Sequence, residues 1–519
     1  MSAALALSPV ERSYSKGRDY FEGLVSYLDS PECCEMNLSE LERGLKKQGL
    51  ELMRQLLQEH VDRRGPGLVV ETIVDADGVE RLRVRPQERK IETIFGTIEE
   101  SRAGYGQEGV ESLHPLDGEL NIPPERYSLE MRRIVAINTA KSSFDEAVET
   151  IDYFTGGYIP KRQVEELTQR AARDFDAFYE KRRHTPCEDG PTGPLLVITV
   201  DGKGVVMHKA DLRDTTRKMA EKRKGKMETR LSRGEKKNCK RMATVAAVYT
   251  IDRFERSPDD LIAEESGGSD KTPRPLPEHK RVWASLEKEP EQVIAEAFDE
   301  AERRDPNHEK QWVALVDGNN TQIDILKRVA KARGVNLTII VDIVHVIEYL
   351  WKAGRVFHPG SGPFLEGWVR QRLLSVLSGK AGWMAGGMRR SAARMELDAK
   401  TREPVDACAT YLVNKSPYLH YDQYLLQGYP IATGVIEGAC RHLVKDRLEI
   451  TGAKWRLKSA EAVLRLRALR SSHDFDEYWT FHEACEYKRN HQDHYKDGVV
   501  PRTIKTHTPS NREHLRIIK

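Results

Sequence analysis

The stretch that most constrains the fold is residues 195–206, with the sequence LLVITVDGKGVV. Six apolar or β-branched residues in a row, preceded by Gly193 and Pro194, predict a strand that is buried on both faces. Asp201 follows that run. A carboxylate at the tip of a rigid strand suits a metal ligand or a general base. The alternative is that Asp201 and Gly202 begin a tight turn into a second strand at 205–209 and have no chemical role.

Two later stretches repeat this pattern of a short apolar strand followed by an acid. Residues 312–316 are followed by Asp317, and residues 337–341 are followed by Asp342. Helical patterns alternate with these strands, which predicts an open α/β sheet with its functional groups at the strand ends.

A further acid, Glu437, lies on a helix predicted at 435–447. If Asp201, Asp317 and Glu437 converge, their mutual repulsion requires a cation between them. Ligands that are all oxygen favour Mg²⁺ or Mn²⁺ over zinc. Two such ions would suit phosphoryl displacement in a nuclease or a polymerase-like enzyme. Alternatively, Glu437 forms a plain surface ladder with Arg441 and Lys445 on the same helix face.

The charge distribution points to a polyanionic partner. The formal net charge is only +2, but residues 213–241 carry 13 Lys and Arg against 4 Asp and Glu. Such a segment can neutralise several phosphates and release their counterions. The alternative is a solvated loop. The candidate phosphate contacts in this basic run are Arg217, Lys222, Arg223 and Lys224.

Replacing Lys222, Arg223, Lys224 and Lys226 of the basic run by alanine tests this interpretation. We expect weaker binding to DNA of every sequence and a shallower dependence of log K on log salt concentration. Binding titrations at several salt concentrations measure that slope. An unaltered slope would show that the run does not touch phosphates.

A helix-turn-helix outline precedes the first acid. Ser143 and Glu146 form a capping-box pattern that opens a helix at 144–154, a glycine turn follows, and Pro160 begins a second helix that we expect to reach about residue 179. In DNA-binding proteins of this outline, the start of the second helix contacts the groove. The candidate contacts are therefore Lys161, Arg162 and Gln163. An ordinary helical hairpin has the same outline.

Several long strings give the chain a resemblance to a known family. They are VITVDGKG, ALVDGN, TGVIEGACRHLVKDRLEITGAKW, RKIETIFGTIEESRAGYG, SLHPLD, LNIPPERYS, SFDEAVE and PKRQVE. The chain resembles the DDE transposases of bacterial insertion sequences, in particular the ISKra-type family. The resemblance implies an RNase H-like mixed-sheet core in which Asp201, Asp317 and Glu437 are catalytic and bind Mg²⁺ or Mn²⁺, as two ions.

The string VDIVHVIEYLW is similar to the Asp-x-x-His motif of Mutator-like transposases, which implies a supporting role for Asp342 and His345. Asp342 also competes with Asp317 as the second metal ligand. We prefer Asp317, because the Gly-Asn-Asn after it lets backbone and substrate approach closely. Seven scattered cysteines without a C-x-x-C pair predict neither a disulfide framework nor a cysteine-rich zinc site.

The predicted organisation has six parts. They are an N-terminal α+β module for end binding or dimerisation at 1–127, with a helix at 37–61 and strands at 68–74, 79–85 and 90–98; a helix-turn-helix-like region at 128–190; a first core part at 191–356, with a basic insertion at 210–242 and a loop at 257–290; an inserted helical subdomain at 357–430; a last core part at 431–480 that carries Glu437; and a loosely ordered basic tail at 481–519.

The predicted activity is cleavage at the element ends followed by 3′-hydroxyl strand transfer into target DNA. The alternatives are a structure-selective nuclease and a domesticated, catalytically silent DNA-binding regulator. Lys203, Arg441, Lys445 and Lys454 are candidate phosphate contacts or solvated side chains, and Trp455 either stacks on a base or packs in the core. We expect a homodimer or larger assembly on the terminal inverted repeats, no membrane segment or signal peptide, and a cytoplasmic, nucleoid-associated protein.

Overall fold

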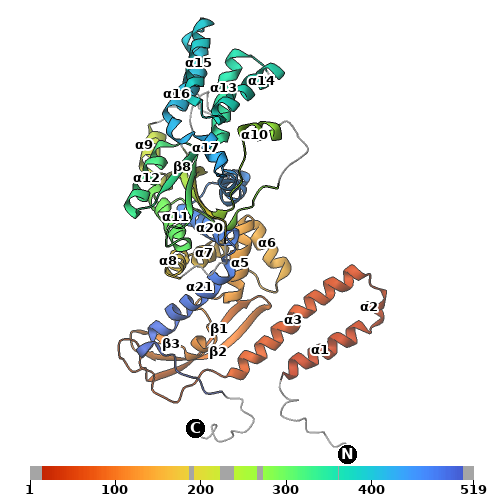
Figure 1. Cartoon of the computed structure of the whole chain (residues 1–519). Helices are drawn as coiled ribbons and strands as arrows, with labels where there is room; N and C mark the ends of the chain where they lie inside the picture. Colours follow the sequence, from red (N-terminus) through yellow and green to blue (C-terminus); the bar gives the residue numbers. More distant parts are fainter. Residues whose placement is uncertain (1–13, 186–191, 223–238, 266–272, 361, 506–519) are drawn as a thin grey trace, which may run out of the picture. The chain divides into compact units, whose positions relative to one another are not determined.

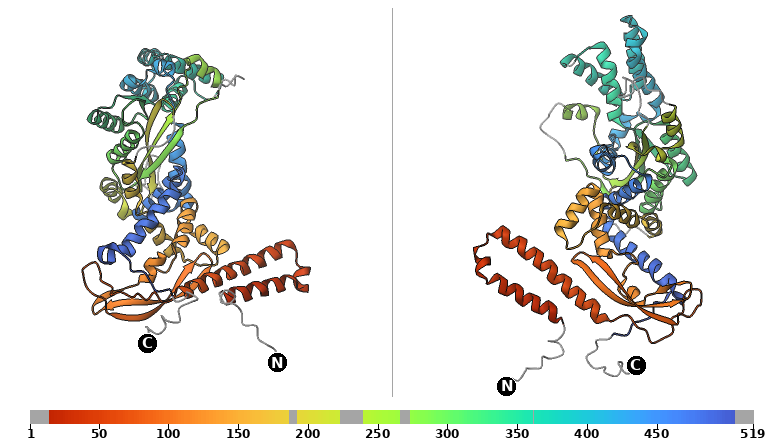
Figure 2. Two further views of the ribbon diagram at one scale, coloured as in Figure 1. Left: turned by 60° about the horizontal axis from the view of Figure 1, so that its bottom comes forward. Right: turned by 180° about the vertical axis from the view of Figure 1, so that it is seen from behind.

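The computed structural model describes residues 14–185, 192–222, 239–265, 273–360 and 362–505. The chain divides into two compact units, shown in Figures 1 and 2. Unit 1 comprises Met1–Asp174 and Asp476–Lys519, and unit 2 comprises Phe175–Phe475. The predicted boundaries differ from this division, because the end of the chain belongs to the same unit as its beginning. Within the described residues, no helix combines the length and apolar composition needed to cross a bilayer.

Unit 1 combines a helical hairpin, an antiparallel sheet and a group of helices. Its elements are α1 (Ser15–Leu28), α2 (Pro31–Glu35), α3 (Leu38–Arg64), β1 (Arg83–Thr93), β2 (Gly96–Gln107), β3 (Val110–Leu113), α4 (Pro115–Leu120), α5 (Leu129–Lys141), α6 (Phe144–Phe154), α7 (Lys161–Ala171) and α21 (Phe475–Asn490). The long helix α3 begins at a capping box in which Asn37 and Glu40 satisfy each other's backbone N–H groups. Helices α1 and α3 lie side by side in Figure 1.

The sheet of unit 1 corrects two strand predictions. The apolar run at 90–98 was expected to be one strand, but the chain reverses within it, and Thr93 pairs with Gly96. Gly96 has φ +126°, which permits this reversal. The hairpin expected at 68–85 is reduced to a single bridge between Val74 and Glu80.

Helices α5, α6 and α7 share one hydrophobic core, whose buried members are Tyr127, Met131, Val135, Ala147, Ile151, Ile159, Val164 and Leu167. The predicted capping box of Ser143 and Glu146 is present at the start of α6. The second helix, expected to reach residue 179, ends at Ala171, and α8 (Phe175–Arg183) follows. The tail expected to be loose instead begins with helix α21, and the described chain continues through short 3₁₀ turns to residue 505.

His491, just after α21, is buried, and its Nε2 has no hydrogen-bond partner among the described atoms. Burial, with smaller contributions from the nearby His494 and Arg89, lowers the pKa of His491 to about 4. The folded state therefore binds fewer protons than the unfolded state, whose histidine pKa is about 6.5, so stability falls as the pH drops below 6.5 toward 4.

We therefore expect His491 to cost the protein about 2 kcal/mol of stability between pH 7.5 and pH 5.0, because one pKa unit corresponds to about 1.4 kcal/mol. A His491→Gln variant lacks this contribution. The free energies of unfolding of parent and variant are measured with urea at both pH values. Between pH 7.5 and pH 5.0, the parent should lose about 2 kcal/mol more than the variant. A difference that does not vary with pH would contradict the assignment.

Unit 2 is built on a five-stranded mixed sheet, which agrees with the predicted α/β class. Its strands are β4 (Leu195–Val206), β5 (Lys240–Ile251), β6 (Glu278–Ser285), β7 (Gln311–Val316) and β8 (Leu337–Val341). The order is β6-β5-β4-β7-β8. Strand β5 is antiparallel to both of its neighbours, β4 and β6, and β7 and β8 are parallel to β4. The middle of the sheet is mostly apolar and buried, whereas several strand ends are polar and partly exposed, so the centre of the sheet forms the core of the unit.

The helices of unit 2 connect and cover these strands. They are α8, described above, α9 (Asp214–Glu221), α10 (Pro258–Glu265), α11 (Pro290–Arg304), α12 (Asn320–Arg333), α13 (Ile343–Phe357), α14 (Pro363–Leu377), α15 (Ala381–Arg394), α16 (Ala399–Lys415), α17 (Tyr421–Leu426), α18 (Gly434–Ala439), α19 (Asp446–Leu448) and α20 (Leu457–Ser471). Helices α14, α15 and α16 form the helical insertion that the sequence predicted after β8.

Two predictions for unit 2 are wrong. Asp201 does not end its strand and does not begin a turn, because β4 continues to Val206 while paired with β5. The loop expected at 257–290 contains helix α10 and the edge strand β6. The first residues of β6 are charged, so the sequence shows no clear strand pattern there, and the buried half of the strand is Arg281–Ser285.

Candidate active site

Three acids form a row across the sheet of unit 2. Val200 of β4 pairs with Val316 of β7, and Val316 pairs with Val341 of β8. The residue after each of these three is an acid: Asp201 lies inside β4, and Asp317 and Asp342 directly follow β7 and β8. Because neighbouring strands are about 4.8 Å apart, the register places these three residues side by side at the level where β7 and β8 end.

The segment that carries Glu437 crosses this row. At one end of the segment, the Thr433 hydroxyl donates a hydrogen bond to Asp342. At the other end, the Cys440 thiol donates to Oδ2 of Asp201 over 3.2 Å. Helix α18 packs on β4 and β5 between these two contacts. Glu437 lies midway along the segment and is exposed, so its carboxylate is accessible above the strand ends.

The charges of these acids act on one another. Partial desolvation raises the pKa of Glu437, Asp342 and Asp201 raise it further, and His345 lowers it. The Asp342 carboxylate, whose Oδ2 lies 3.5 Å from Nδ1 of His345, raises the pKa of His345, and Asp317 adds to that effect. Burial raises the pKa of Cys440, so this group stays a thiol that donates to Asp201. The site is therefore an acidic centre that favours bound cations.

Asp342 and Asp317 differ in how their oxygens are used. Asp342 is fully buried; its Oδ1 accepts from the backbone N–H of Val344 at 2.9 Å, and its Oδ2 accepts from Thr433 and lies 3.5 Å from Nδ1 of His345. Asp317 is partly exposed, and its Oδ1 accepts from its own loop at Asn319 over 2.8 Å. Among the described residues, no partner engages its other oxygen. Asp342 therefore positions α13 and the Glu437 segment, whereas Asp317 has an oxygen free to bind a ligand.

The ligand atoms of Asp201, Asp317 and Glu437 do not cluster tightly. In the described part of the chain, one set of three potential ligand side chains has its ligand atoms within 4.8 Å of one another, and that set lies in unit 1. Carboxylates without a cation between them repel one another and separate. That the three acids close around one metal stays a prediction.

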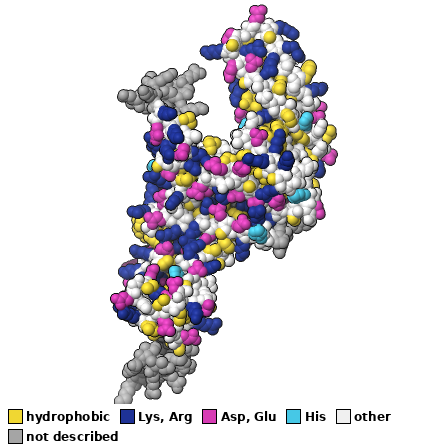
Figure 3. Space-filling model, turned by 90° about the vertical axis from the view of Figure 1, so that its left-hand side faces the viewer, with side chains coloured by type: hydrophobic (Ala, Val, Ile, Leu, Met, Phe, Trp, Pro, Cys, Tyr) yellow, Lys and Arg dark blue, Asp and Glu magenta, His cyan; other side chains and the backbone are white. Residues whose placement is uncertain are grey.

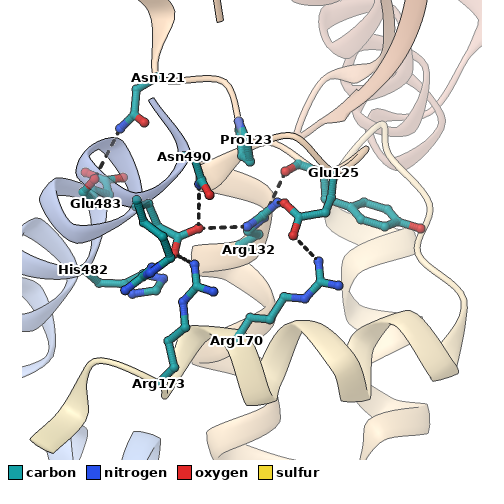
Figure 4. Close-up of polar contacts among 12 residues, drawn as sticks. Asn121, Pro123, Glu125, Arg132, Arg170, Arg173, His482, Glu483 and Asn490 are labelled. Carbon is teal, nitrogen blue, oxygen red and sulfur yellow. Dashed lines mark hydrogen bonds and ion pairs between the residues drawn. The ribbon is translucent and has the colours of Figure 1, made fainter. Parts of the chain in front are cut away.

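The set in unit 1 comprises Asp174, His482 and Glu486, all buried. His482 Nδ1 lies 2.6 Å from Oδ2 of Asp174. The guanidinium groups that pair with the two carboxylates belong to Arg132, Arg173 and Arg489. Figure 4 shows Arg132 and Arg173 directed into this cluster beside His482. Because arginines already compensate both carboxylates, the cluster is a charge-balanced structural network rather than a cation site.

The candidate phosphate contacts differ in their surroundings. Lys222, Lys445 and Lys454 are exposed and Lys203 partly so. Arg217 pairs with Asp214 at 2.5 Å, and Arg441 lies 3.6 Å from Asp446. Arg223 and Lys224 lie outside the described residues. On the face shown in Figure 3, basic and acidic side chains are interspersed.

The helix predicted at 435–447 is interrupted. It consists of α18, a π-helical turn η3 (Cys440–Lys445) and α19. The π-helical turn has more residues per turn than an α-helix, so Glu437, Arg441 and Lys445 do not form the regular stripe that α-helical spacing predicted.

Trp455 is a correction to the predicted DNA contacts. Its ring is 5% exposed, and its Nε1–H donates to the Leu448 carbonyl at 3.0 Å. The Arg447 guanidinium lies over the ring, 4.9 Å from its centre. The indole therefore packs in unit 2 and is not available to stack on a base.

The candidate groove contacts of α7 already pair with acids of their own unit. Lys161 Nζ lies 2.6 Å from Asp145, Arg162 Nε lies 3.2 Å from Glu166, and Gln163 also donates to Glu166, at 3.1 Å. These are exposed pairs of low strength. A phosphate that bound here would have to displace them.

Sequence reasoning missed two groups beside the acidic row, Tyr411 and Lys415 of α16. The Tyr411 hydroxyl donates to the Asp317 carbonyl at 3.2 Å, and Lys415 Nζ donates to Asn320 Oδ1. Burial lowers the pKa of Lys415, although Asp317 acts in the opposite direction. Both residues come from the helical insertion, and no local pattern links that insertion to the loop after β7.

Comparisons with known proteins do not add to this description: no protein-family model matches the chain, and no curated protein matches it.

Proposed function

We propose that this protein is a metal-dependent DNA transposase that cuts at the ends of an insertion sequence and joins the freed 3′-hydroxyl to target DNA. The single observation that carries the proposal is the acidic row in register on β4, β7 and β8, crossed by the segment that bears Glu437. Carboxylates gathered on one sheet can hold the two metal ions that stabilise the attacking and leaving oxygens in phosphoryl transfer.

We further propose that unit 2 has an RNase H-like core. Three consecutive antiparallel strands are followed by two strands parallel to the first, with helices α11 and α12 leading into them. The helical insertion between β8 and α18 agrees with the resemblance of the sequence to transposases of this type. Asp201 and Asp317 lie at the central strands, where both can face one substrate.

The donor set fits Mg²⁺ or Mn²⁺, because Asp201, Asp317 and Glu437 offer only oxygen. In a two-ion site the metal activates the attacking oxygen and stabilises the leaving one. Among the chain's own residues, Asp342 holds the crossing segment through Thr433. Cys440 holds Asp201 at the other end. These contacts fix the two ends of the segment that presents Glu437.

The proposal is tested with DNA from the coding region's own flanks, because inverted repeats just outside the gene would identify the element ends. Purified protein is incubated with duplexes that carry such ends, either intact or already cut, with and without Mg²⁺. We expect cleavage of intact ends and joined products from cut ends, both dependent on the metal. Cleavage without joined products would favour a nuclease. Binding without cleavage would favour a silent regulator and overturn the proposal.

We also propose that the protein acts as a dimer or larger assembly, because two ends must be cut together. Light scattering with and without end DNA tests this part. A monomer on DNA under conditions that give joined products would contradict it.

A further inference from the structure

Unit 1 contains a groove of about 850 Å³ that the proposed chemistry does not use. It lies between α3, the β1–β2 turn and the end of α6. Four cations line it: Arg43, Lys46, Lys47 and Arg54. Two acids also line it, Glu51 and Asp152. Arg54 already binds Glu51 at 2.6 Å, which leaves three basic side chains and one further acid. Of these three, Lys46 also donates to the Tyr153 carbonyl.

Exposed aromatic rings border these cations. Tyr153 and Phe154 are each 65% exposed, and they contact each other edge to face with ring centres 4.8 Å apart. The Lys46 ammonium lies 3.8 Å from the centre of the Tyr153 ring and 5.1 Å from that of Phe154. Tyr158, in the turn after α6, is 58% exposed. Adjacent large rings with so much surface in water are typical of a binding surface.

At the bottom of the groove, the backbone of the β1–β2 turn lies in close contact with the backbone after α6. The N–H of Gly156 donates to the Ile94 carbonyl at 2.9 Å. A Cβ at Gly156 would lie 2.2 Å from the Phe95 carbonyl oxygen, and a Cβ at Gly96 would lie 3.0 Å from the Arg54 side chain. Glycine at both positions therefore lets the β1–β2 turn press against the end of α6. The cations and rings are held on a preformed surface.

We propose that this groove binds a single strand of nucleic acid, with Arg43, Lys46 and Lys47 on its phosphates and the rings of Tyr153 and Phe154 stacked on its unpaired bases. Cations that follow a backbone beside aromatic side chains are the general means of holding single strands. Among the described residues, no acid pairs with these three cations, whereas Lys161 and Arg162 at the start of α7 do pair with acids. The proposal deepens the proposed function, since a staggered double-strand cut at an element end would leave unpaired bases.

The test uses the full chain and a fluorescein-labelled 20-nucleotide oligo-dT, with anisotropy as the measurement. We expect Tyr153→Ala combined with Phe154→Ala to weaken binding about five- to a hundredfold, the range that stacking on one base implies. Tyr153→Trp should retain binding because it keeps a stacking ring. Phe364→Ala removes a comparably exposed ring on α14 of unit 2 and should leave binding unchanged.

The cations are tested through the salt dependence. Lys46→Ala combined with Lys47→Ala should reduce the slope of log K against log salt by about 1.4, because each phosphate contact on a single strand contributes about 0.7. Lys90→Ala removes an exposed cation of β1 that pairs with Glu99 and serves as the matched control. Thermal melting of each variant confirms that the fold is retained.

Three results would overturn the proposal: no binding of oligo-dT by the parent, full binding by the double aromatic variant, or an unchanged salt slope in the double lysine variant. A 20-base-pair duplex that binds more tightly than oligo-dT and resists the aromatic changes would also overturn it, in favour of a duplex site. The groove and the proposed chemistry are tested independently, because Asp201→Asn removes a proposed metal ligand but should bind oligo-dT as the parent does. If the parent binds oligo-dT through the groove but cuts no DNA, the groove stands and the transposase proposal falls.

Discussion

Asp201→Asn should reduce metal-dependent cleavage of end DNA by more than a hundredfold while DNA binding is retained. Residues that only orient a metal ligand cost about 10- to 100-fold when they are changed, so removal of a charged ligand itself should cost more. The change is nearly isosteric. Asp201 accepts from Gly202 on Oδ1 and from Cys440 on Oδ2, and the single amide oxygen of Asn can keep one of these two hydrogen bonds. Cleavage rates over a titration of Mg²⁺ measure the effect. Glu437→Gln should behave in the same way.

The matched control is Asp324→Asn, because Asp324 is an exposed acid of α12, the helix that follows Asp317. It should cut like the parent. Asp342→Asn should fall between the two, since Asp342 acts through Thr433 and α13 rather than on DNA. A higher Mg²⁺ concentration should restore part of the cleavage activity lost in Asp342→Asn, whereas it should not restore the activity lost in Asp201→Asn. Unchanged cleavage by Asp201→Asn would remove the catalytic assignment.

Glu486→Gln should destabilise unit 1 by about 3–5 kcal/mol, the cost of removing one partner from a buried ion pair. Glu486 is 1% exposed, and without its charge Arg132 and Arg173 lose a compensating carboxylate. Arg132 retains Glu125 as a partner at 2.5 Å. Urea unfolding followed by fluorescence measures the change.

The control for this prediction is Glu130→Gln, which removes an exposed partner of Arg133 and should cost less than about 1 kcal/mol. Because arginines balance Asp174 and Glu486, a chelator should leave the unfolding midpoint of the parent unchanged. A midpoint that falls with chelator and recovers with added Zn²⁺ would show instead that Asp174, His482 and Glu486 hold a metal.

The sequence predicted the parts of unit 2 whose signal is local. The strands before Asp201, Asp317 and Asp342 are nearly continuous apolar runs, the pattern typical of strands that are covered on both faces of a sheet. Strand β6 was not predicted, because it lies at the edge of the sheet and its first half carries charged side chains. In unit 1, the run at 90–98 looked like one strand because apolar periodicity does not register the reversal at Gly96.

The candidate site was predictable in its acids but not in the contacts that position them. Thr433 and Cys440 became visible only when the chain brought them to Asp342 and Asp201. The spacing of the acids in the sequence could not show that both oxygens of Asp342 accept hydrogen bonds, whereas one oxygen of Asp317 has no partner among the described residues. The network of Asp174 and Glu486 joins residues more than three hundred positions apart, so no pattern within a window of sequence contains it.

That unit 1 is assembled from both ends of the chain has a consequence for biosynthesis. Helix α21 supplies Glu486 and the Tyr478 hydroxyl, which donates to the Ala171 carbonyl at 2.6 Å. These groups leave the ribosome only after all of unit 2 has been made. Arg132 and Arg173 of the nascent amino-terminal portion therefore lack the Glu486 carboxylate until then, while unit 2 can already fold.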